Sequence, residues 1–125
     1  MSPEQRMVRD FHLKHGAPVA TRPGQIGVKD RLRRARLIVS EAAEFLEAAD
    51  KDDFVEMVDA LVDILVVTYG AAGELGVDLE PVFAEIHRSN MTKNGGLDAG
   101  GKILKGPAFQ RPDVLGELRK QGYEG

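Results

Sequence analysis

Several common features are missing from this chain of 125 residues, and each absence excludes a class of protein or of site. It has no cysteine, so it can form neither disulfides nor thiolate metal sites, as is usual in a reducing compartment. No apolar run approaches the ~18 residues of a membrane helix. The N-terminal stretch MSPEQRMVRDF lacks the apolar segment of a secretory signal. These absences predict a cytoplasmic protein without a membrane partner.

The net charge is small, −3, but its distribution is uneven. Residues 1–39 carry nine Lys/Arg and three Asp/Glu, whereas residues 40–87 carry one Lys and thirteen Asp/Glu. Residues 88–125 return to seven Lys/Arg against four Asp/Glu. Because nucleic acids require an extended basic face, no nucleic-acid partner is expected. The pattern indicates a cation site whose surroundings can also hold an anion, although clustered solvated helix faces would produce it too.

The spacing of apolar residues predicts helices throughout and no strands. The expected helices span residues 3–14, 28–49, 53–75, 79–90 and 113–121. Asp52 and Asp78 are expected to cap the third and fourth of these, because an aspartate accepts hydrogen bonds from the first free backbone N–H groups. Residues 91–112 hold five glycines and two prolines, which is typical of a functional or disordered loop.

One domain is expected over residues 1–125, with a helical core at 1–93 and a glycine-rich loop and tail at 94–125. After Leu61 the third helix is apolar nearly all round, and such a helix must be buried on every side. A chain of this size has too few neighbouring helices to cover it. We therefore expect an all-α, four-helix-bundle-like fold within an oligomer.

The stretch VDALVDILVV, residues 58–67, places acids inside an apolar run. Asp63 is flanked by Val62 and Ile64, and Asp59 lies one turn before it. An isolated ionised carboxylate costs many kcal/mol in an apolar interior. Asp63 must therefore be paired, protonated or bound to a metal.

A second group of acids lies on the preceding helix. At roughly 100° per residue, Glu41 and Glu44 project within about 60° of each other. On the next helix Glu56, Asp59 and Asp63 share an arc of similar width. The short turn between the two helices makes them antiparallel neighbours, so the two groups can face each other. Hard oxygen ligands in this number predict a site for Mg²⁺, or for Mn²⁺.

Other uses of these acids stay open. Arg33 and Arg36 are the natural competing partners, and they would make the acids structural. A di-iron bundle would require Glu-x-x-His on facing helices, whereas the pair formed by Glu85 and His87 is spaced by two residues and splits onto different faces. His12, three residues before the next histidine, is interpreted as an ordinary polar position.

Five motifs carry a resemblance that covers nearly the whole chain. They are EAAE (41–44), EMVDALVD (56–63), YGAAGELGVDLEPVF (69–83), HRSNMTK (87–93) and GKILKGP (101–107). Together they resemble the all-α nucleoside triphosphate pyrophosphohydrolases, which are the MazG-like and phosphoribosyl-ATP-pyrophosphohydrolase-like proteins, dUTP-hydrolysing members included. The resemblance implies a helical bundle acting as a dimer or tetramer. It also implies Mg²⁺ held by ExxE and ExxD pairs on consecutive helices, and cleavage of the substrate to a nucleoside monophosphate and pyrophosphate.

By position, Glu41 and Glu44 match the ExxE pair, as metal ligands and as candidates for the base that accepts the proton of the attacking water. The second pair has two alignments. Glu56 and Asp59 have ExxD spacing, whereas Asp63 stands where other branches place the aspartate of that motif. We expect Asp59 and Asp63 to be ligands and leave Glu56 open. The chain departs from the family pattern in two places, with Ser40 before Glu41 and Ala60 at the glutamate position of the second alignment.

The basic residues that follow are expected to hold the phosphates. The expected substrate-binding residues are Asn90, Lys93, Lys102 and Lys105. Glycines around them would let the loop approach the phosphates closely. The preferred base is not encoded in any motif, and dUTP follows from the resemblance alone.

Three alternatives to this activity stay open. One is hydrolysis of phosphoribosyl-ATP. A second is a non-catalytic oligomeric bundle whose acids are neutralised by a partner's arginines. The third is a regulatory nucleotide-binding protein without catalysis.

Overall fold

The computed structural model describes all 125 residues, and its only regular elements are helices. These are α1 (Pro3–Lys14), α2 (Val28–Asp50), α3 (Phe54–Leu75), α4 (Leu79–Asn90) and α5 (Val114–Lys120). The predicted all-α class is confirmed. None of the five helices combines the length and the apolar character that a bilayer span requires.

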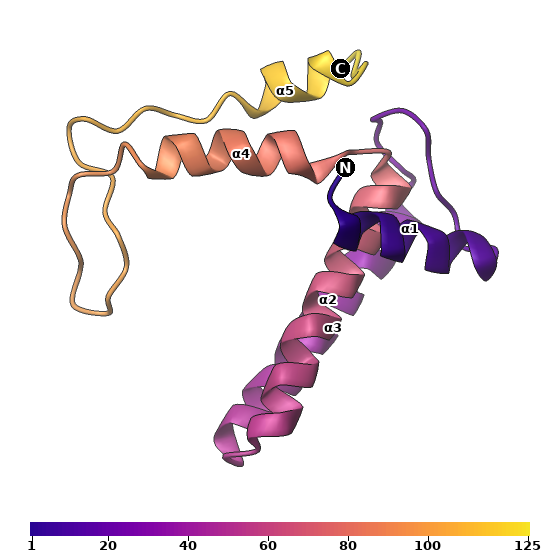
Figure 1. Cartoon of the computed structure of the whole chain (residues 1–125), viewed down its shortest axis with the longest axis horizontal. Coiled ribbons are helices and arrows are strands. Elements are labelled where there is room, and N and C mark those ends of the chain that lie inside the picture. The colour runs from indigo at the N-terminus through magenta and orange to yellow at the C-terminus, as the bar shows by residue number, and fades with distance from the viewer.

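Helices α2 and α3 form a long antiparallel hairpin (Figure 1). The prediction that Asp52 caps α3 is wrong by one residue, because Asp53 accepts the hydrogen bond from the backbone N–H of Glu56, at 3.2 Å. Asp52 instead takes the left-handed turn conformation, with a φ of 54°. At its other end α3 is capped by Gly76, whose φ of 73° suits a residue without a β-carbon. The hairpin therefore has a defined turn and a defined end.

The corner between α3 and α4 is held by side chains from both ends of the chain. Gln5 of α1 is almost fully buried, donates to the carbonyl of Val77 at 2.8 Å and accepts from the N–H of Leu79 at 3.0 Å. Gln121 near the C-terminus bonds both the N–H and the carbonyl of Asp78, each at 2.8 Å. As predicted, Asp78 caps α4, accepting from the N–H of Glu80 at 3.1 Å. These bonds fix the direction in which α4 leaves the hairpin.

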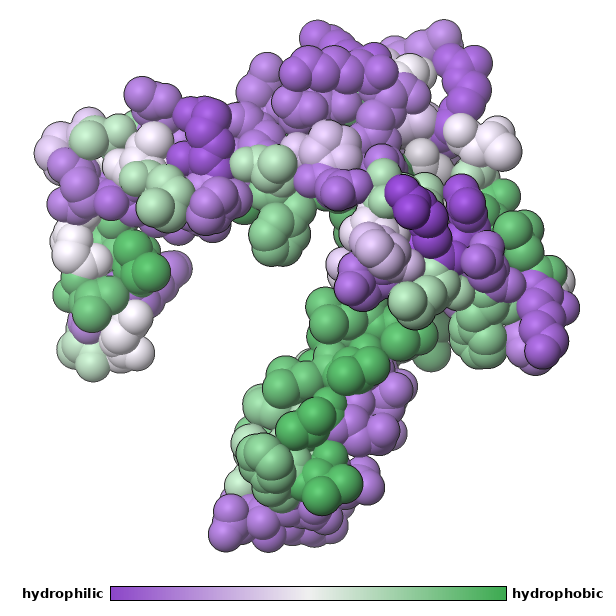
Figure 2. All heavy atoms as spheres, in the orientation of Figure 1, coloured by the Kyte–Doolittle hydropathy of each residue, from purple (hydrophilic) through white to green (hydrophobic).

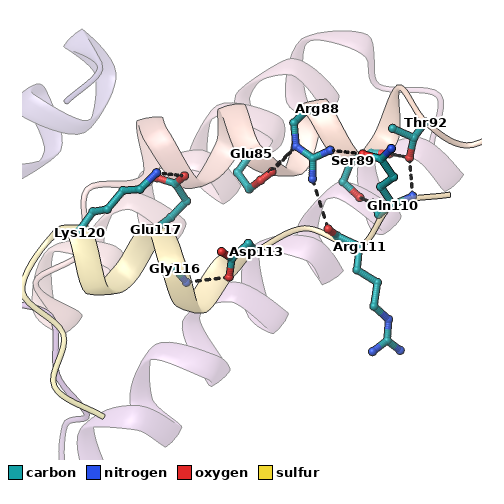
Figure 3. A network of polar contacts seen from close by, with 10 residues as sticks. All are labelled: Glu85, Arg88, Ser89, Thr92, Gln110, Arg111, Asp113, Gly116, Glu117 and Lys120. Carbon is teal, nitrogen blue, oxygen red and sulfur yellow. Dashed lines mark hydrogen bonds and ion pairs between the residues drawn. The ribbon is translucent and has the colours of Figure 1, made fainter.

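Helix α4 runs away from the hairpin as an arm, and α5 lies alongside it (Figure 1). Figure 3 shows the polar contacts that fasten the returning chain to α4. Ser89, 1% exposed, donates to the carbonyl of Gln110 at 2.6 Å, and Arg88 donates to the side-chain oxygen of Gln110 at 2.8 Å. The N–H of Gln110 in turn donates to the hydroxyl of Thr92 at 2.8 Å. The C-terminal segment is thus part of the arm.

The glycine-rich loop folds back on itself at the far end of α4 (Figure 1). Asn94 donates its N–H to the carbonyl of Lys105 at 2.9 Å, and Leu104 donates to that of Gly96 at 2.8 Å. An isolated antiparallel bridge joins Leu97 to a residue on the opposite side of the loop. The loop is therefore an ordered hairpin-like element.

Burial is slight for a chain of this length. Ten of 125 residues are buried, and large apolar side chains remain exposed on all five helices and the loop. Figure 2 shows apolar residues running along the hairpin and beneath the arm. The chain exposes 8714 Å², whereas a compact monomer of its mass exposes about 6,600 Å². One chain alone leaves much of its apolar surface open to water.

Candidate metal centre

The α2–α3 hairpin brings the predicted carboxylates of the two helices together. One carboxylate oxygen each of Glu41, Glu44 and Asp63 lies within 4.8 Å of the other two. Glu41 and Asp63 are half-buried, and Glu44 is exposed. Asp59 is exposed one turn from Asp63 and acts electrostatically on both Asp63 and Glu41. We refer to Glu41, Glu44, Asp59 and Asp63 as the carboxylate cluster.

The cluster disfavours its own negative charge. The pKa of Glu41 is raised, first because a proton can be held between it and Glu44, then by burial and by the charges of Glu44, Asp63 and Asp59. The pKa of Asp63 is raised chiefly by burial, and then by the charges of Asp59 and Glu44. The upward shift of both pKa values indicates that a positive charge, a proton or another cation, is favoured here.

One oxygen of the cluster has no hydrogen-bond partner. Oε2 of Glu41 is the only side-chain oxygen or nitrogen in the chain that is buried and unpaired. Buried polar atoms are nearly always satisfied, so an orphan of this kind needs an explanation. Neighbouring carboxylates cannot satisfy it unless they are protonated, because ionised carboxylates only accept. A cation would satisfy it directly, and the all-oxygen donor set suits Mg²⁺ or Mn²⁺.

Neither arginine that was expected to compete for these acids is paired with them, and Arg36 forms no ion pair within the chain. Arg33 bonds Glu74 at 3.0 Å and Asp30 at 3.4 Å, and Arg34 bonds Glu74. Lys51, at the turn of the hairpin, pairs with Glu47 instead. None of the ion pairs within the chain involves the carboxylate cluster. Within one chain the cluster has no cation of its own.

Glu56 lies outside the closely spaced group. It lines an open cleft of about 320 Å³ between the cluster and the turn of the hairpin, together with Glu44, Asp59 and Lys51. The closely spaced group contains Asp63 and not Glu56. The geometry therefore groups Asp63, and not Glu56, with Glu41 and Glu44, and it leaves Glu56 on the wall of the cleft.

The predicted phosphate-binding residues lie in a different part of the chain. Asn90 ends α4, Lys93 follows it, and Lys102 and Lys105 belong to the loop. The ammonium of Lys105 lies over the ring of Phe109, 5.2 Å from its centre. In Figure 1 this loop hangs from the far end of the arm, away from the hairpin. Within one chain, the structure does not bring these residues to the carboxylate cluster.

A second buried charge was missed by the sequence analysis. Glu74 of α3 is 4% exposed and is bonded by Arg33 and Arg34. His12, interpreted from sequence as an ordinary polar position, packs beside Arg34 against Gly70. The signal was available, because Glu74 interrupts the apolar segment YGAAGEL just as Asp63 interrupts the run VDALVDILVV at 58–67.

Fold and site together define an all-α protein with an uncompensated carboxylate cluster suited to a divalent cation. The family model of phosphoribosyl-ATP pyrophosphohydrolase matches residues 8–90, two thirds of the chain. The chain belongs to this family, within the MazG-like all-α nucleoside triphosphate pyrophosphohydrolases, and the resemblance found in the sequence is confirmed. Hydrolysis of a phosphoanhydride with release of pyrophosphate is the activity of this family.

The matched region has a limit that bears on the site. It contains every residue of the carboxylate cluster and Asn90, but it ends before Lys93, Lys102 and Lys105. No curated protein matches the chain. The roles of the three lysines thus depend on the sequence resemblance alone.

Proposed function

We propose that the chain is a divalent-metal-dependent pyrophosphohydrolase that cleaves a nucleoside triphosphate, such as dUTP, between its α- and β-phosphates. The observation that carries the proposal is the convergence of Glu41, Glu44 and Asp63 within 4.8 Å, with one buried oxygen of Glu41 unpaired. The family's activity supports the same reaction class.

The four residues of the carboxylate cluster would hold Mg²⁺ or Mn²⁺. When bound, such an ion neutralises phosphate charge and lowers the pKa of a coordinated water. Glu44 is the exposed member of the closely spaced group, so it is the residue best placed to accept the proton of the attacking water from the open side. Glu41 is the second candidate base, because its raised pKa makes it the stronger proton acceptor.

Phosphoribosyl-ATP is a second candidate substrate, favoured by the description of the matching family. It shares with a nucleoside triphosphate the anhydride that would be cut. The deciding test is pyrophosphate release from a panel of common NTPs, dNTPs and phosphoribosyl-ATP, each with Mg²⁺, with Mn²⁺ and with EDTA. Release from none of them with either ion would refute the proposal and favour a non-catalytic or regulatory protein.

Variants at the cluster sharpen this test. Asp63→Asn removes one charge while keeping the side-chain shape, and it is expected to abolish metal-dependent turnover. Glu47→Gln is the matched control, since Glu47 lies on the same hairpin but is exposed and paired with Lys51. Equal activity in both variants would remove the cluster from the catalytic machinery.

We also propose that a second copy of the chain covers the hairpin. Leu61 and Leu65 lie about 160° from Asp63 around α3, on the side opposite the cluster, and both are about half exposed. On α2, Val39 and Leu46 lie similarly far from Glu41 and are more exposed still. Two such hairpins packed apolar face to apolar face would form a four-helix bundle with the acids outside the seam.

The surface area supports an obligate homo-oligomer. The chain exposes 8714 Å², about 2,100 Å² more than a compact monomer of its mass. Obligate interfaces bury on the order of 1,000–2,500 Å² on each partner. The excess is therefore of the size that such an interface removes. Light scattering of the full chain is expected to give a dimer or tetramer, and a monomer at micromolar concentration would contradict it.

A second copy of the chain would also bring loop lysines close to the carboxylate cluster, which one chain alone does not do. We propose that the loop of one protomer supplies Lys102 and Lys105 to the cluster of another. Mixed oligomers of Asp63→Asn and Lys105→Ala test this, because each mixed pair would contain one intact site. Refolding the two inactive variants together should restore about a quarter of wild-type activity if the oligomer is a dimer. No recovery in verified mixed oligomers would place both residue sets in the same protomer.

A further inference from the structure

The open end of the α2–α3 hairpin holds a charge cluster of its own, which the proposed reaction does not use. Glu74 is 4% exposed and Arg34 is 7% exposed. Arg34 bonds one carboxylate oxygen of Glu74, and Arg33 donates to both oxygens, at 3.0 and 3.1 Å. One buried acid thus forms ion pairs with two arginines. We call these three residues the arginine clamp.

Helix α1 closes the arginine clamp from the third side. His12 packs so closely against α3 that a β-carbon on Gly70 would lie 2.6 Å from its Cε1 and 3.0 Å from a guanidinium nitrogen of Arg34. The pKa of His12 is lowered, first by burial and then by the charge of Arg34, with Glu74 opposing. Arg34 therefore lies among α1, α2 and α3, and Glu74 is the only acid with which it forms an ion pair.

The arginine clamp and the carboxylate cluster share one seam between α2 and α3. Arg34 precedes Glu41 by seven residues, so the two lie on one face of α2, about 10.5 Å apart along the axis. Glu74 follows Asp63 by eleven residues and lies within about 20° of it around α3. Seven residues are two helical turns, a separation that the extended side chains of an arginine and a glutamate can bridge together. The unpaired Oε2 of Glu41 is an acceptor without a donor.

Without Glu74 the buried guanidinium of Arg34 would lose its counter-ion. A buried charge that loses its partner must find another or reach water. Glu41 and Asp63 lie along the same seam, and neither forms an ion pair within the chain. A guanidinium bound there would occupy the oxygens that a divalent cation needs.

We propose that Glu74 is a positioning residue that keeps the carboxylate cluster available to a metal by holding Arg34 at the open end of the hairpin. The inference rests on the proposed metal site. A purely stabilising role explains the clamp less well, because buried ion pairs contribute little net stability compared with apolar residues of the same volume.

The test measures Mn²⁺ affinity by electron paramagnetic resonance, with the full chain at fixed pH and folding checked by circular dichroism. Glu74→Gln keeps the shape of the side chain and releases the arginine. We expect its Mn²⁺ affinity to fall on the order of tenfold, the effect of a nearby cation in a partly hydrated site. The double variant Arg34→Gln/Glu74→Gln should recover wild-type affinity, because the competing guanidinium is gone.

Two controls separate this effect from others. Arg34→Gln alone should bind Mn²⁺ like the wild type, because Arg33 still occupies Glu74. Glu47→Gln removes a negative charge near the cluster without releasing an arginine, so its affinity should change far less than that of Glu74→Gln. A loss in Glu74→Gln that the double variant does not recover would show a structural effect and overturn the inference.

The remaining outcomes are equally decisive. A folded Glu74→Gln variant with wild-type affinity overturns the inference. If this variant does not fold, Glu74→Asp replaces it, since it keeps the charge but shortens the reach toward Arg34, and unchanged Mn²⁺ affinity there overturns the inference too. A wild-type chain that binds no Mn²⁺ would instead refute the proposed metal site, so the two failures are distinguishable.

Discussion

Removing one charge from the carboxylate cluster should stabilise the metal-free protein. The same change should destroy the proposed metal site. The perturbation is Asp63→Asn, which keeps size and shape. The oxygens of Glu41, Glu44 and Asp63 lie within 4.8 Å of one another. Two unit charges at this separation repel by about 1 kcal/mol in water and about 3.5 kcal/mol at an effective dielectric of 20. Asp63 is half-buried, so we expect a gain of about 1–3 kcal/mol.

The assay is thermal unfolding at one protein concentration, with EDTA and with saturating Mg²⁺ or Mn²⁺. In EDTA at pH 8, Asp63→Asn should raise the Tm by about 4 °C per kcal/mol gained. In the wild type, metal should raise the Tm, because a ligand that binds only the folded state stabilises it by mass action. The variant should lose most of this metal-dependent increase. It should therefore be more stable than the wild type without metal and show the smaller response to it.

Glu47→Gln is the control, because it should not raise the Tm in EDTA. It breaks the exposed pair with Lys51 and relieves no repulsion in the cluster, so its Tm in EDTA should stay unchanged or fall slightly. The reasoning is refuted if Asp63→Asn melts below the wild type in EDTA. It is equally refuted if this variant retains the full metal-dependent increase in Tm.

Three further predictions follow. The pKa values of Glu41 and Asp63 are raised in the folded state, so the folded metal-free chain binds more protons than the unfolded chain just above the ordinary carboxyl range. Its unfolding free energy should therefore fall as pH rises through that window, and the advantage of Asp63→Asn in urea unfolding should be larger at pH 8 than at pH 4.5. Gly70→Ala should destabilise the chain by about 1–3 kcal/mol in the same assay, because its β-carbon would lie 2.6 Å from His12, and His12→Ala should recover part of the loss. Lys102→Ala should raise KM for the nucleotide with little change in Tm, since this side chain is exposed, and unchanged kinetics would end its proposed role.

Much of the fold could be predicted because its signals are local. Apolar spacing indicated all five helices, and Asp78 and Gly76 mark a start and an end that backbone geometry requires. The cap of α3 was misplaced because consecutive aspartates compete for it, and only the turn geometry decides between Asp52 and Asp53.

The direction of the arm could not be predicted in the same way. It depends on Gln5 and Gln121, which bond the α3–α4 corner from opposite ends of the chain. Nothing in the sequence near that corner identifies these partners. The position of Lys102 and Lys105 relative to the acids is harder still to predict from the sequence, because it depends on the proposed second chain.

The candidate site was predictable from one physical contradiction, an acid inside an apolar run. Glu74 presents the same contradiction but was not predicted as a buried charge, because its partners Arg33 and Arg34 lie 41 and 40 residues away in the sequence. The structure separates the two cases by what stands opposite each acid. Glu74 meets two arginines and is electrically satisfied, whereas Asp63 meets only other acids. Since α2 supplies arginines to one end of the seam and glutamates to the other, one helix gives Glu74 two positive partners and leaves Asp63 among negative charges alone.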